Sequence, residues 1–164
     1  MGYTTDFSGS FQLDKPLKDA HQNYLMAFSE TRRMKRDSEK AVTMKDLNRT
    51  LVNLPIGEEG AYFTGGKGFM GQDFDESVID GNCPPKGQPG LWCQWIPTEN
   101  GDEIIWDSGE KFYNYTEWLE YIINHFLKPW GYTLNGQVLW QGEDINDRGL
   151  LIVKNNVVVS KELQ

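Results

Sequence analysis

The chain has 164 residues, of which 24 are acidic and 16 basic, and its net charge is −8. A chain of this length predicts a single domain over residues 1–164. The negative charge argues against the nonspecific attraction to phosphate on which most nucleic-acid binders depend, so direct nucleic-acid binding is not expected. The sequence has neither an apolar run of membrane-spanning length nor a signal peptide, which predicts a cytoplasmic protein without membrane contact.

Alternating apolar and polar side chains at residues 3–13 predict a half-buried strand. Residues 16–34 carry apolar side chains at helical spacing and predict the first main helix. A shorter helix is expected at residues 44–54, just before Pro55, and a short strand at residues 61–64. From residue 65 to residue 90, frequent glycines and prolines predict one long irregular loop.

The second half of the chain predicts a hairpin, a helix and a series of strands. Residues 91–96 and 103–107 alternate well enough for the two strands of a hairpin. The second main helix is expected at residues 114–127, with Asn114 as its N-cap. Further strands are expected at residues 132–134, 137–140, 149–153 and 157–159, with turns at Asn135-Gly136 and Asn155-Asn156.

This order of elements predicts an α+β fold: a mostly antiparallel sheet with two main helices packed on one face and a long Gly/Pro-rich loop. Most of the tryptophans fall on the buried side of these elements. Trp118 lies on the apolar helix face, and Trp106 and Trp140 close alternating strands. Trp92 and Trp130 are the ones expected to project from the surface.

Five distinctive stretches of the chain are YTTDFSGSF, DKPL, SETRRMKR, PPKGQPGLWCQW and WDSGEKFYNYTEWLEYIINHFLKPWGY. Together they resemble a family of small phage and bacterial proteins that is defined as a domain of unknown function. The resemblance covers most of the chain and implies no catalytic residue. It implies a bacterial or phage-infected cytoplasm and, if the gene is viral, a protein that binds and diverts a host machine.

Acidic residues are concentrated in the second part of the chain. Residues 1–56 have a net charge of +2 and residues 57–164 one of −10. This surplus predicts a non-enzymatic protein-binding module that presents carboxylates to a basic surface of a host or cellular protein. One form of this function is a phage-encoded inhibitor that occupies a nucleic-acid-binding site. The candidate partner-binding residues are Asp73, Asp75, Glu76, Asp80, Glu99, Asp102, Glu103, Trp92 and Trp130.

A basic cluster of Arg32, Arg33, Lys35 and Arg36 lies at the predicted end of the first helix. In the last turn, these positive charges would interact with the negative end of the helix dipole. Alternatively, they dock an acidic groove, a phosphate, or the acidic half of a second copy in a homodimer. We therefore count all four among the candidate partner-binding residues.

The string GKGFMG at residues 66–71 matches the GxGxxG pattern, but no helical face follows it as a dinucleotide fold requires. The alternative function is a small metal-dependent enzyme or binding protein that acts on a nucleotide or phosphorylated small molecule. Gly65, Gly66, Gly68 and Gly71 would bind the cofactor, and Asp73, Asp75 and Asp80 would hold a divalent cation. No other cofactor is predicted.

Catalytic motifs are otherwise missing from the sequence. His21 and His125 both fall on predicted helices, and no nucleophile at a motif spacing is tied to either. The two cysteines, Cys83 and Cys93, are expected to be reduced thiols. We therefore assign no catalytic residue and favour a function other than catalysis.

Overall fold

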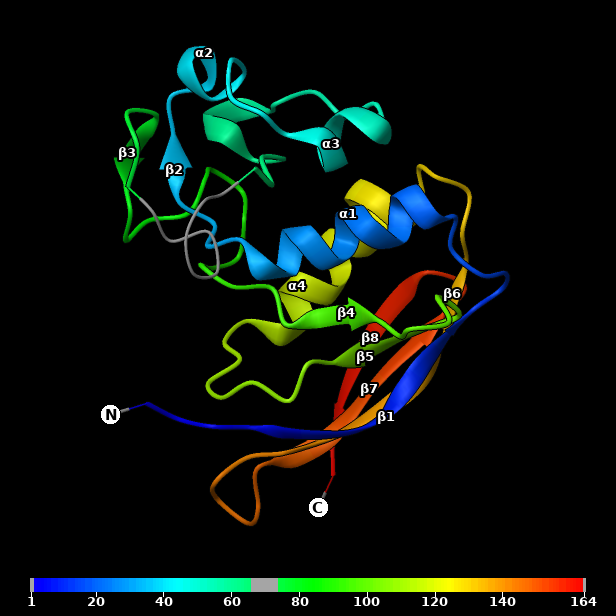
Figure 1. Cartoon of the computed structure of the whole chain (residues 1–164). Coiled ribbons are helices and arrows are strands. Elements are labelled where there is room, and N and C mark those ends of the chain that lie inside the picture. Colours follow the sequence, from blue (N-terminus) through cyan, green and yellow to red (C-terminus); the bar gives the residue numbers. More distant parts are fainter. Residues whose placement is uncertain (1, 66–73, 164) are drawn as a thin grey trace. The chain divides into compact units, whose positions relative to one another are not determined.

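A computed structural model describes residues 2–65 and 74–163 of the chain and has an α+β fold (Figure 1). Its contacts divide the chain into two compact units. Unit 1 comprises Met1–Leu17 and Gln94–Gln164, and unit 2 comprises Lys18–Cys93. The prediction of a single domain stays a prediction. None of the helices in the described ranges has the length and apolar character needed to cross a membrane.

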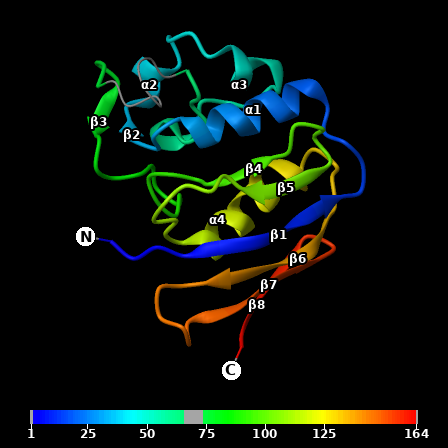
Figure 2. The ribbon, with the colours of Figure 1, turned by 60° about the horizontal axis from the view of Figure 1, so that its bottom comes forward.

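Unit 1 contains a six-stranded antiparallel sheet in the order β4-β5-β1-β6-β7-β8. Its central strand β1 pairs with β5 on one side and with β6 on the other. Figure 2 shows β1, β6, β7 and β8 side by side. The strands are β1 (Asp6–Leu13), β4 (Trp95–Pro97), β5 (Glu103–Trp106), β6 (Leu134–Gln141), β7 (Arg148–Lys154) and β8 (Val157–Glu162).

Helix α4 (Tyr115–Ile122) packs against this sheet and continues as a π-helical turn, η3 (Ile123–Leu127). The predicted helix at residues 114–127 is therefore confirmed. Asn114 is the N-cap residue as expected, but its backbone is left-handed (φ 58°) and its side chain makes no capping hydrogen bond. Trp118 and Phe126 are fully buried on the apolar face.

Aromatic rings fill the core of unit 1. The ring of Phe7 on β1 lies at the centre of four edge-on contacts, to Trp95, Trp106, Phe112 and Tyr115, with centroid distances of 5.0 to 5.8 Å. These contacts follow from period-two alternation, which turns the odd-numbered side chains of β1 inward. Edge-on pairs of this kind add to the free energy gained by burying each ring.

One of the two predicted turns is wrong, because strand β6 runs through it. Asn135-Gly136 was expected to reverse the chain, but both residues lie inside one continuous strand. Gly136 has φ 133°, and a Cβ there would lie 3.1 Å from the Cα of Phe11 on β1. Glycine therefore allows the close approach of two strands at this position. The other predicted turn, Asn155-Asn156, is confirmed, with φ values of 48° and 69°.

Unit 2 consists of short elements joined by irregular backbone. Strands β2 and β3 form a two-stranded antiparallel ladder. Neither strand was predicted, because β2 has two residues and β3 lies within the expected loop. The elements are α1 (Asp19–Glu30), β2 (Lys35–Arg36), α2 (Ser38–Ala41), α3 (Leu47–Leu51), η1 (Glu58–Gly60) and β3 (Val78–Asp80).

Helix α1 ends earlier than its apolar spacing predicts. Thr31 adopts extended backbone (φ −104°, ψ 123°), and its hydroxyl donates to the carbonyl of Ala27 at 2.8 Å. The last turn of α1 contains no basic residue. The prediction that the basic cluster lies in this turn, against the helix dipole, is therefore wrong.

Candidate functional site

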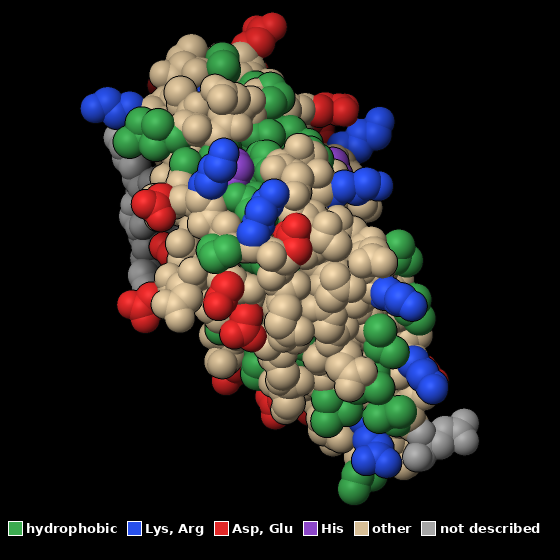
Figure 3. Space-filling model, turned by 90° about the vertical axis from the view of Figure 1, so that its right-hand side faces the viewer, with side chains coloured by type: hydrophobic (Ala, Val, Ile, Leu, Met, Phe, Trp, Pro, Cys, Tyr) green, Lys and Arg blue, Asp and Glu red, His purple; other side chains and the backbone are tan. Residues whose placement is uncertain are grey.

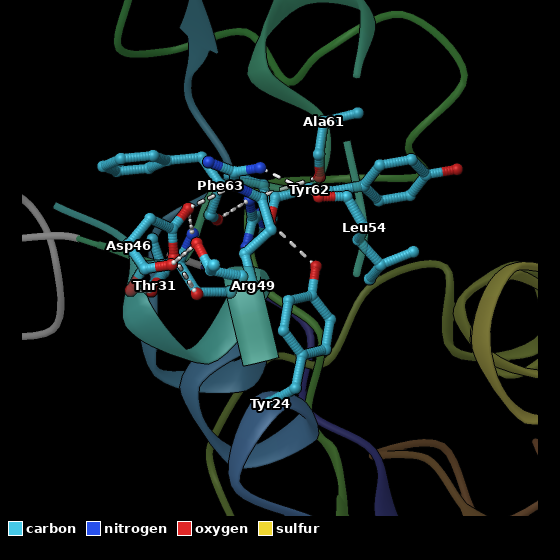
Figure 4. Close-up of polar contacts among 11 residues, drawn as sticks. Tyr24, Thr31, Asp46, Arg49, Leu54, Ala61, Tyr62 and Phe63 are labelled. Atoms are coloured by element: carbon cyan, nitrogen blue, oxygen red, sulfur yellow. Dashed lines mark hydrogen bonds and ion pairs between the residues drawn. The ribbon is translucent and has the colours of Figure 1, made fainter. Parts of the chain in front are cut away.

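Residues 61–64 of unit 2 are held by side chains in place of strand neighbours. The predicted strand does not form there. The hydroxyl of Tyr24 donates to the carbonyl of Tyr62 at 2.8 Å (Figure 4), and Gln88 donates to that of Ala61 at 2.6 Å. The guanidinium of Arg33 donates to the carbonyls of Ala61 at 3.3 Å and Phe63 at 2.5 Å. Buried side chains therefore satisfy backbone carbonyls that a ladder would otherwise satisfy.

Asp46 and Arg49 form a buried ion pair next to this segment. The Nε of Arg49 lies 2.9 Å from Oδ2 of Asp46, whose side chain is 1% exposed. Thr64 donates to the same carboxylate through its backbone N–H at 3.1 Å and its hydroxyl at 2.6 Å. Arg49 also donates to the carbonyl of Leu54 at 2.8 Å. A buried charge needs this degree of hydrogen bonding, so the pair is structural.

Arg36 is buried and joins β2 to the segment before β3. Its Nη1 lies 2.9 Å from Oδ2 of Asp75 and 2.9 Å from the hydroxyl of Ser77. The guanidinium also lies over the ring of Phe63, 4.1 Å from the centroid. Burial opposes ionisation of Asp75, but the hydrogen bonds from Ser77 and Arg36 outweigh it and hold the pKa of this carboxyl below its usual value.

The rest of the basic cluster is also engaged within unit 2. The ammonium of Lys35 lies 3.1 Å from Glu59, which raises the pKa of Lys35. Arg32 donates to the carbonyl of Gly81 at 2.9 Å. Arg33 and Arg36 are each 2% exposed. These two guanidinium groups are therefore part of the interior of unit 2, and neither offers a surface for a partner.

The predicted phosphate and metal site falls partly outside the described residues, because Gly66, Gly68, Gly71 and Asp73 are not described. At Gly65, a Cβ would lie 2.0 Å from the carbonyl oxygen of Lys45, so packing alone requires glycine there. The carboxylate of Asp80 accepts from the N–H of Asn82 at 2.8 Å. Within residues 2–65 and 74–163, no three His, Cys, Asp or Glu side chains cluster closely enough to hold a metal ion.

A cavity of about 370 Å³ lies beside Asp75 and Ser77. The described residues that line it include the acidic Glu39, Asp75 and Glu76 and the basic Lys40. Such a lining repels a phosphate group unless a cation is bound with it. Thr43 and Met44 complete the wall.

The other predicted partner-binding residues do not gather at one place. Asp102 lies in the turn between β4 and β5, where its carboxylate accepts from the hydroxyl of Thr98 at 3.2 Å. The carboxylate of Glu103 accepts from Ser10 on the neighbouring strand β1. Glu99, Glu76 and Asp80 are exposed, and Trp92 and Trp130 are half-buried. Trp92 belongs to unit 2, whereas Trp130 belongs to unit 1.

Unit 1 does bring together a different acidic group, at one end of its sheet. The hydroxyl of Tyr3 donates to Asp147 at 2.6 Å and accepts from the N–H of Asp144 at 3.2 Å. The N–H of Tyr3 donates to the hydroxyl of Tyr113 at 3.3 Å. Tyr3 and Tyr113 are 40% and 52% exposed. We call this the acidic tyrosine surface, and its residues are Tyr3, Tyr113, Glu117, Asp144, Asp147 and Glu162.

The electrostatics of Tyr115 show that these carboxylates lie close together. Burial and the negative charges of Asp147, Glu117 and Glu162 raise the pKa of Tyr115 to about 12. The hydrogen bond to Asp147 likewise raises the pKa of Tyr3. The negative potential therefore comes from three elements at once: the start of α4, the loop between β6 and β7, and the end of β8.

A cavity of about 540 Å³ opens beside this surface. Its walls come from the β6–β7 loop and from the end of β8, and it includes the carboxylate of Glu162 and the guanidinium of Arg148. Ile145 is 79% exposed at its rim. Its lining therefore offers one carboxylate, one guanidinium and an exposed apolar side chain.

Sequence reasoning missed the acidic tyrosine surface because its parts are far apart in the chain. Tyr3 and Asp144 are 141 positions apart. The available signal was the run EDIND at residues 143–147, which holds three acids in five residues between two strands. Its contact with the amino-terminal segment depends on β1 lying next to β6, which local patterns do not predict.

Comparison of the chain with protein-family models, with curated proteins and with solved structures found no match. The resemblance to small phage and bacterial proteins therefore stays a prediction. Function has to be inferred from the geometry and charge of the two units.

Proposed function

We propose that the protein is a non-enzymatic acidic protein-binding module that docks a basic surface of its partner through the acidic tyrosine surface of unit 1. One observation carries this proposal. Glu117, Asp144, Asp147 and Glu162 are all exposed, and none of them forms an ion pair with a described residue. The ion pairs of Lys35, Arg36 and Arg49 all lie in unit 2.

The charge of each unit supports this choice of surface. Unit 1 carries 13 acidic and 6 basic side chains, a net charge of −7, whereas unit 2 carries 11 and 10. Uncompensated negative charge repels itself in the free protein and is relieved when a basic partner binds. It also accelerates association with a positively charged surface.

The exposed tyrosines supply the apolar part of such an interface. Tyrosine gives a large contact area with few rotatable bonds, and it is enriched at the centres of protein interfaces. The backbone N–H of Tyr3 holds the hydroxyl of Tyr113, and Asp147 holds the hydroxyl of Tyr3, so little side-chain entropy remains to be lost on binding.

The class of partner that we propose is a nucleic-acid-binding protein of a bacterial host. A surface that normally binds phosphates is basic, and an acidic protein can occupy it in place of nucleic acid. The resemblance to small phage and bacterial proteins favours a phage-encoded inhibitor that acts in the cytoplasm. The alternative function, metal-dependent chemistry on a phosphorylated molecule, is disfavoured because Asp75, one of its predicted metal ligands, is paired with Arg36, and acidic residues line the cavity beside Asp75.

The test is a capture experiment on the proteins of a bacterial extract that are retained by DNA-cellulose. The immobilised wild-type protein is compared with the variant Glu117→Gln/Asp147→Asn/Glu162→Gln. A matched control, Glu30→Gln/Glu39→Gln/Glu58→Gln, removes the same charge from exposed positions of unit 2. Asp147→Asn keeps an acceptor for the hydroxyl of Tyr3.

We expect the wild type and the unit 2 control to retain a specific protein that the unit 1 variant loses. Retention should fall steeply between about 50 and 200 mM salt, because the Debye length halves over this range. Added nucleic acid should compete with the immobilised protein for binding to the captured protein. Equal loss in both triple variants, or retention that is independent of salt, would contradict the proposal.

A further inference from the structure

The two edges of the sheet in unit 1 are protected unequally. The edge strand β4 has three residues and contains Pro97, and both features discourage pairing with another strand. The opposite edge strand, β8, has six residues, contains no proline and begins with Val157, Val158 and Val159. Val157 and Val159 are 62% and 54% exposed. Helix α4 also contacts β8, but no described residue outside β7 hydrogen-bonds to the backbone of β8, so this edge is open to strand addition.

The phase of the β7–β8 ladder determines which backbone groups this edge presents. A two-residue turn at Asn155-Asn156 is closed by hydrogen bonds between its flanking residues, Lys154 and Val157. Because hydrogen-bonded pairs alternate in an antiparallel ladder, the odd-numbered residues of β8 bond to β7. The N–H of Leu163 donates to the carbonyl of Arg148 at 2.9 Å, in agreement with this phase. The N–H and C=O groups of Val158, Ser160 and Glu162 therefore point outward.

We propose that two copies of the chain associate by antiparallel pairing of β8 with β8, about a two-fold axis at Val159. In this arrangement Val158 and Ser160 of one copy exchange backbone hydrogen bonds with Ser160 and Val158 of the other. Val157 then lies opposite Lys161 of the second copy. The two six-stranded sheets become one continuous sheet.

The side chains of β8 favour this register, and they favour a second copy of the chain over a strand from another protein. Registers centred on Val159 and on Ser160 both pair five residues of each strand, but only the first places valine against valine. On the sheet face that carries the exposed valines, Val159 already lies opposite Ile152 of β7. Pairing about Val159 therefore makes a row of four apolar side chains, Ile152 and Val159 from each copy, across the new junction. A strand from another protein would need an apolar side chain opposite Val159 to make an equivalent contact, whereas β8 of a second copy already has one there.

Charges on the same face are compatible with this pairing. Lys154 and Lys161 flank the apolar row. In the proposed register the two copies of Lys161 lie at opposite ends of the junction, and each shares a row with Val157 and Lys154 of the other copy. Figure 3 shows a face on which hydrophobic side chains lie beside Lys and Arg side chains along its lower right margin. Salt screens the repulsion between these lysines, so added salt should not weaken the dimer. The proposed partner interface on the acidic tyrosine surface behaves in the opposite way.

The first test is disulfide trapping of Val159→Cys in a Cys83→Ser background, since Cys83 is an exposed free thiol and Cys93 is buried. Across the two-fold axis Val159 forms a non-hydrogen-bonded pair, with Cα atoms about 4.5 Å apart, which a disulfide can bridge. Val157→Cys is the matched control on the same face. Its two copies would lie roughly 13 Å apart, because each is four residues along the strand from the position opposite the other.

We expect covalent dimer from Val159→Cys under mild oxidation and at least tenfold less from Val157→Cys. Sedimentation should show the unmodified protein to be a concentration-dependent dimer. The variant Val159→Lys places two lysines on the axis and should be monomeric, with an unchanged circular dichroism spectrum. Equal trapping of both cysteines, or a wild type that is monomeric up to millimolar concentration, would overturn the proposal. Neither result depends on the acidic tyrosine surface.

Discussion

Units 1 and 2 satisfy their polar backbone groups in different ways. In unit 1 a ladder of six strands pairs the backbone with itself, and aromatic rings fill the core. In unit 2 the carbonyls of residues 61–63 accept hydrogen bonds from the side chains of Tyr24, Arg33 and Gln88. Irregular backbone can therefore be buried, provided that long polar side chains replace the missing ladder.

The two units also differ in the use of charge. Unit 2 pairs Arg36 with Asp75 and Arg49 with Asp46, and its charges nearly cancel. Unit 1 leaves its carboxylates exposed and raises the pKa of Tyr115 to about 12 through burial and their negative charge. This difference separates structural charge from charge that is free to act on a partner, and each of the following measurements tests it.

The largest expected effect is that of Arg49→Met in unit 2. The substitution leaves Asp46 buried without its ionic partner, so we expect the free energy of unfolding of unit 2 to fall by about 3–5 kcal/mol. Hydrogen exchange measured by mass spectrometry follows peptides from each unit separately. The control is Arg148→Met, which changes an exposed arginine of unit 1 and should alter stability by less than about 0.5 kcal/mol. Equal protection in both variants would mean that the buried pair contributes little.

A smaller effect is expected for Tyr24→Phe. The substitution deletes the hydrogen bond from this hydroxyl to the carbonyl of Tyr62, at an expected cost of about 1–3 kcal/mol in the free energy of unfolding. Tyr113→Phe removes a hydroxyl at an exposed position and should cost less than about 0.5 kcal/mol. Urea denaturation of the two variants gives the comparison. A loss in Tyr113→Phe as large as that in Tyr24→Phe would show that the exposed tyrosines are structural as well.

The smallest effect concerns alkaline pH and unit 1. The pKa of Tyr115 is about 12 in the folded chain and 10.0 for the ordinary side chain, so the folded state holds the proton more tightly. This contribution to stability is fully present below pH 10 and is lost as the pH rises toward 12. Ultraviolet titration of the phenols should show a late-titrating group that disappears in Tyr115→Phe and shifts to lower pH in Asp147→Asn. Titration of every tyrosine near pH 10 would contradict the proposed acidic environment.

Elements with a strong period were predictable from the sequence, and those held by side chains were not. The alternation of β1 and the apolar face of α4 identified both elements, and Asn155-Asn156 identified the turn between β7 and β8. The sequence misled at Arg33, which resembles a helix-capping cation but is a buried donor to two backbone carbonyls. No local pattern distinguishes these roles, because the difference lies in residues 61–63, about 30 positions away.

The candidate site was predictable in chemistry but not in place. The sequence shows a surplus of acidic residues after residue 56, and this surplus predicts carboxylates that face a basic partner. Asp75, however, is paired with Arg36, whereas Asp147 and Glu162 gather beside Tyr3 at the end of the sheet. Sequence alone does not show which charges are neutralised in the fold, since that depends on long-range contacts.

The most direct test of the central claim is an NMR titration of the ¹⁵N-labelled protein with a short arginine-rich peptide at low salt. The peptide is a basic probe without a defined structure, so it reports where the exposed negative potential is strongest. We predict that amide shifts concentrate at residues 113–117, 143–148 and 162 and vanish when the salt concentration is raised. Shifts spread evenly over both units, or concentrated beside Glu39 and Glu76 in unit 2, would contradict the account.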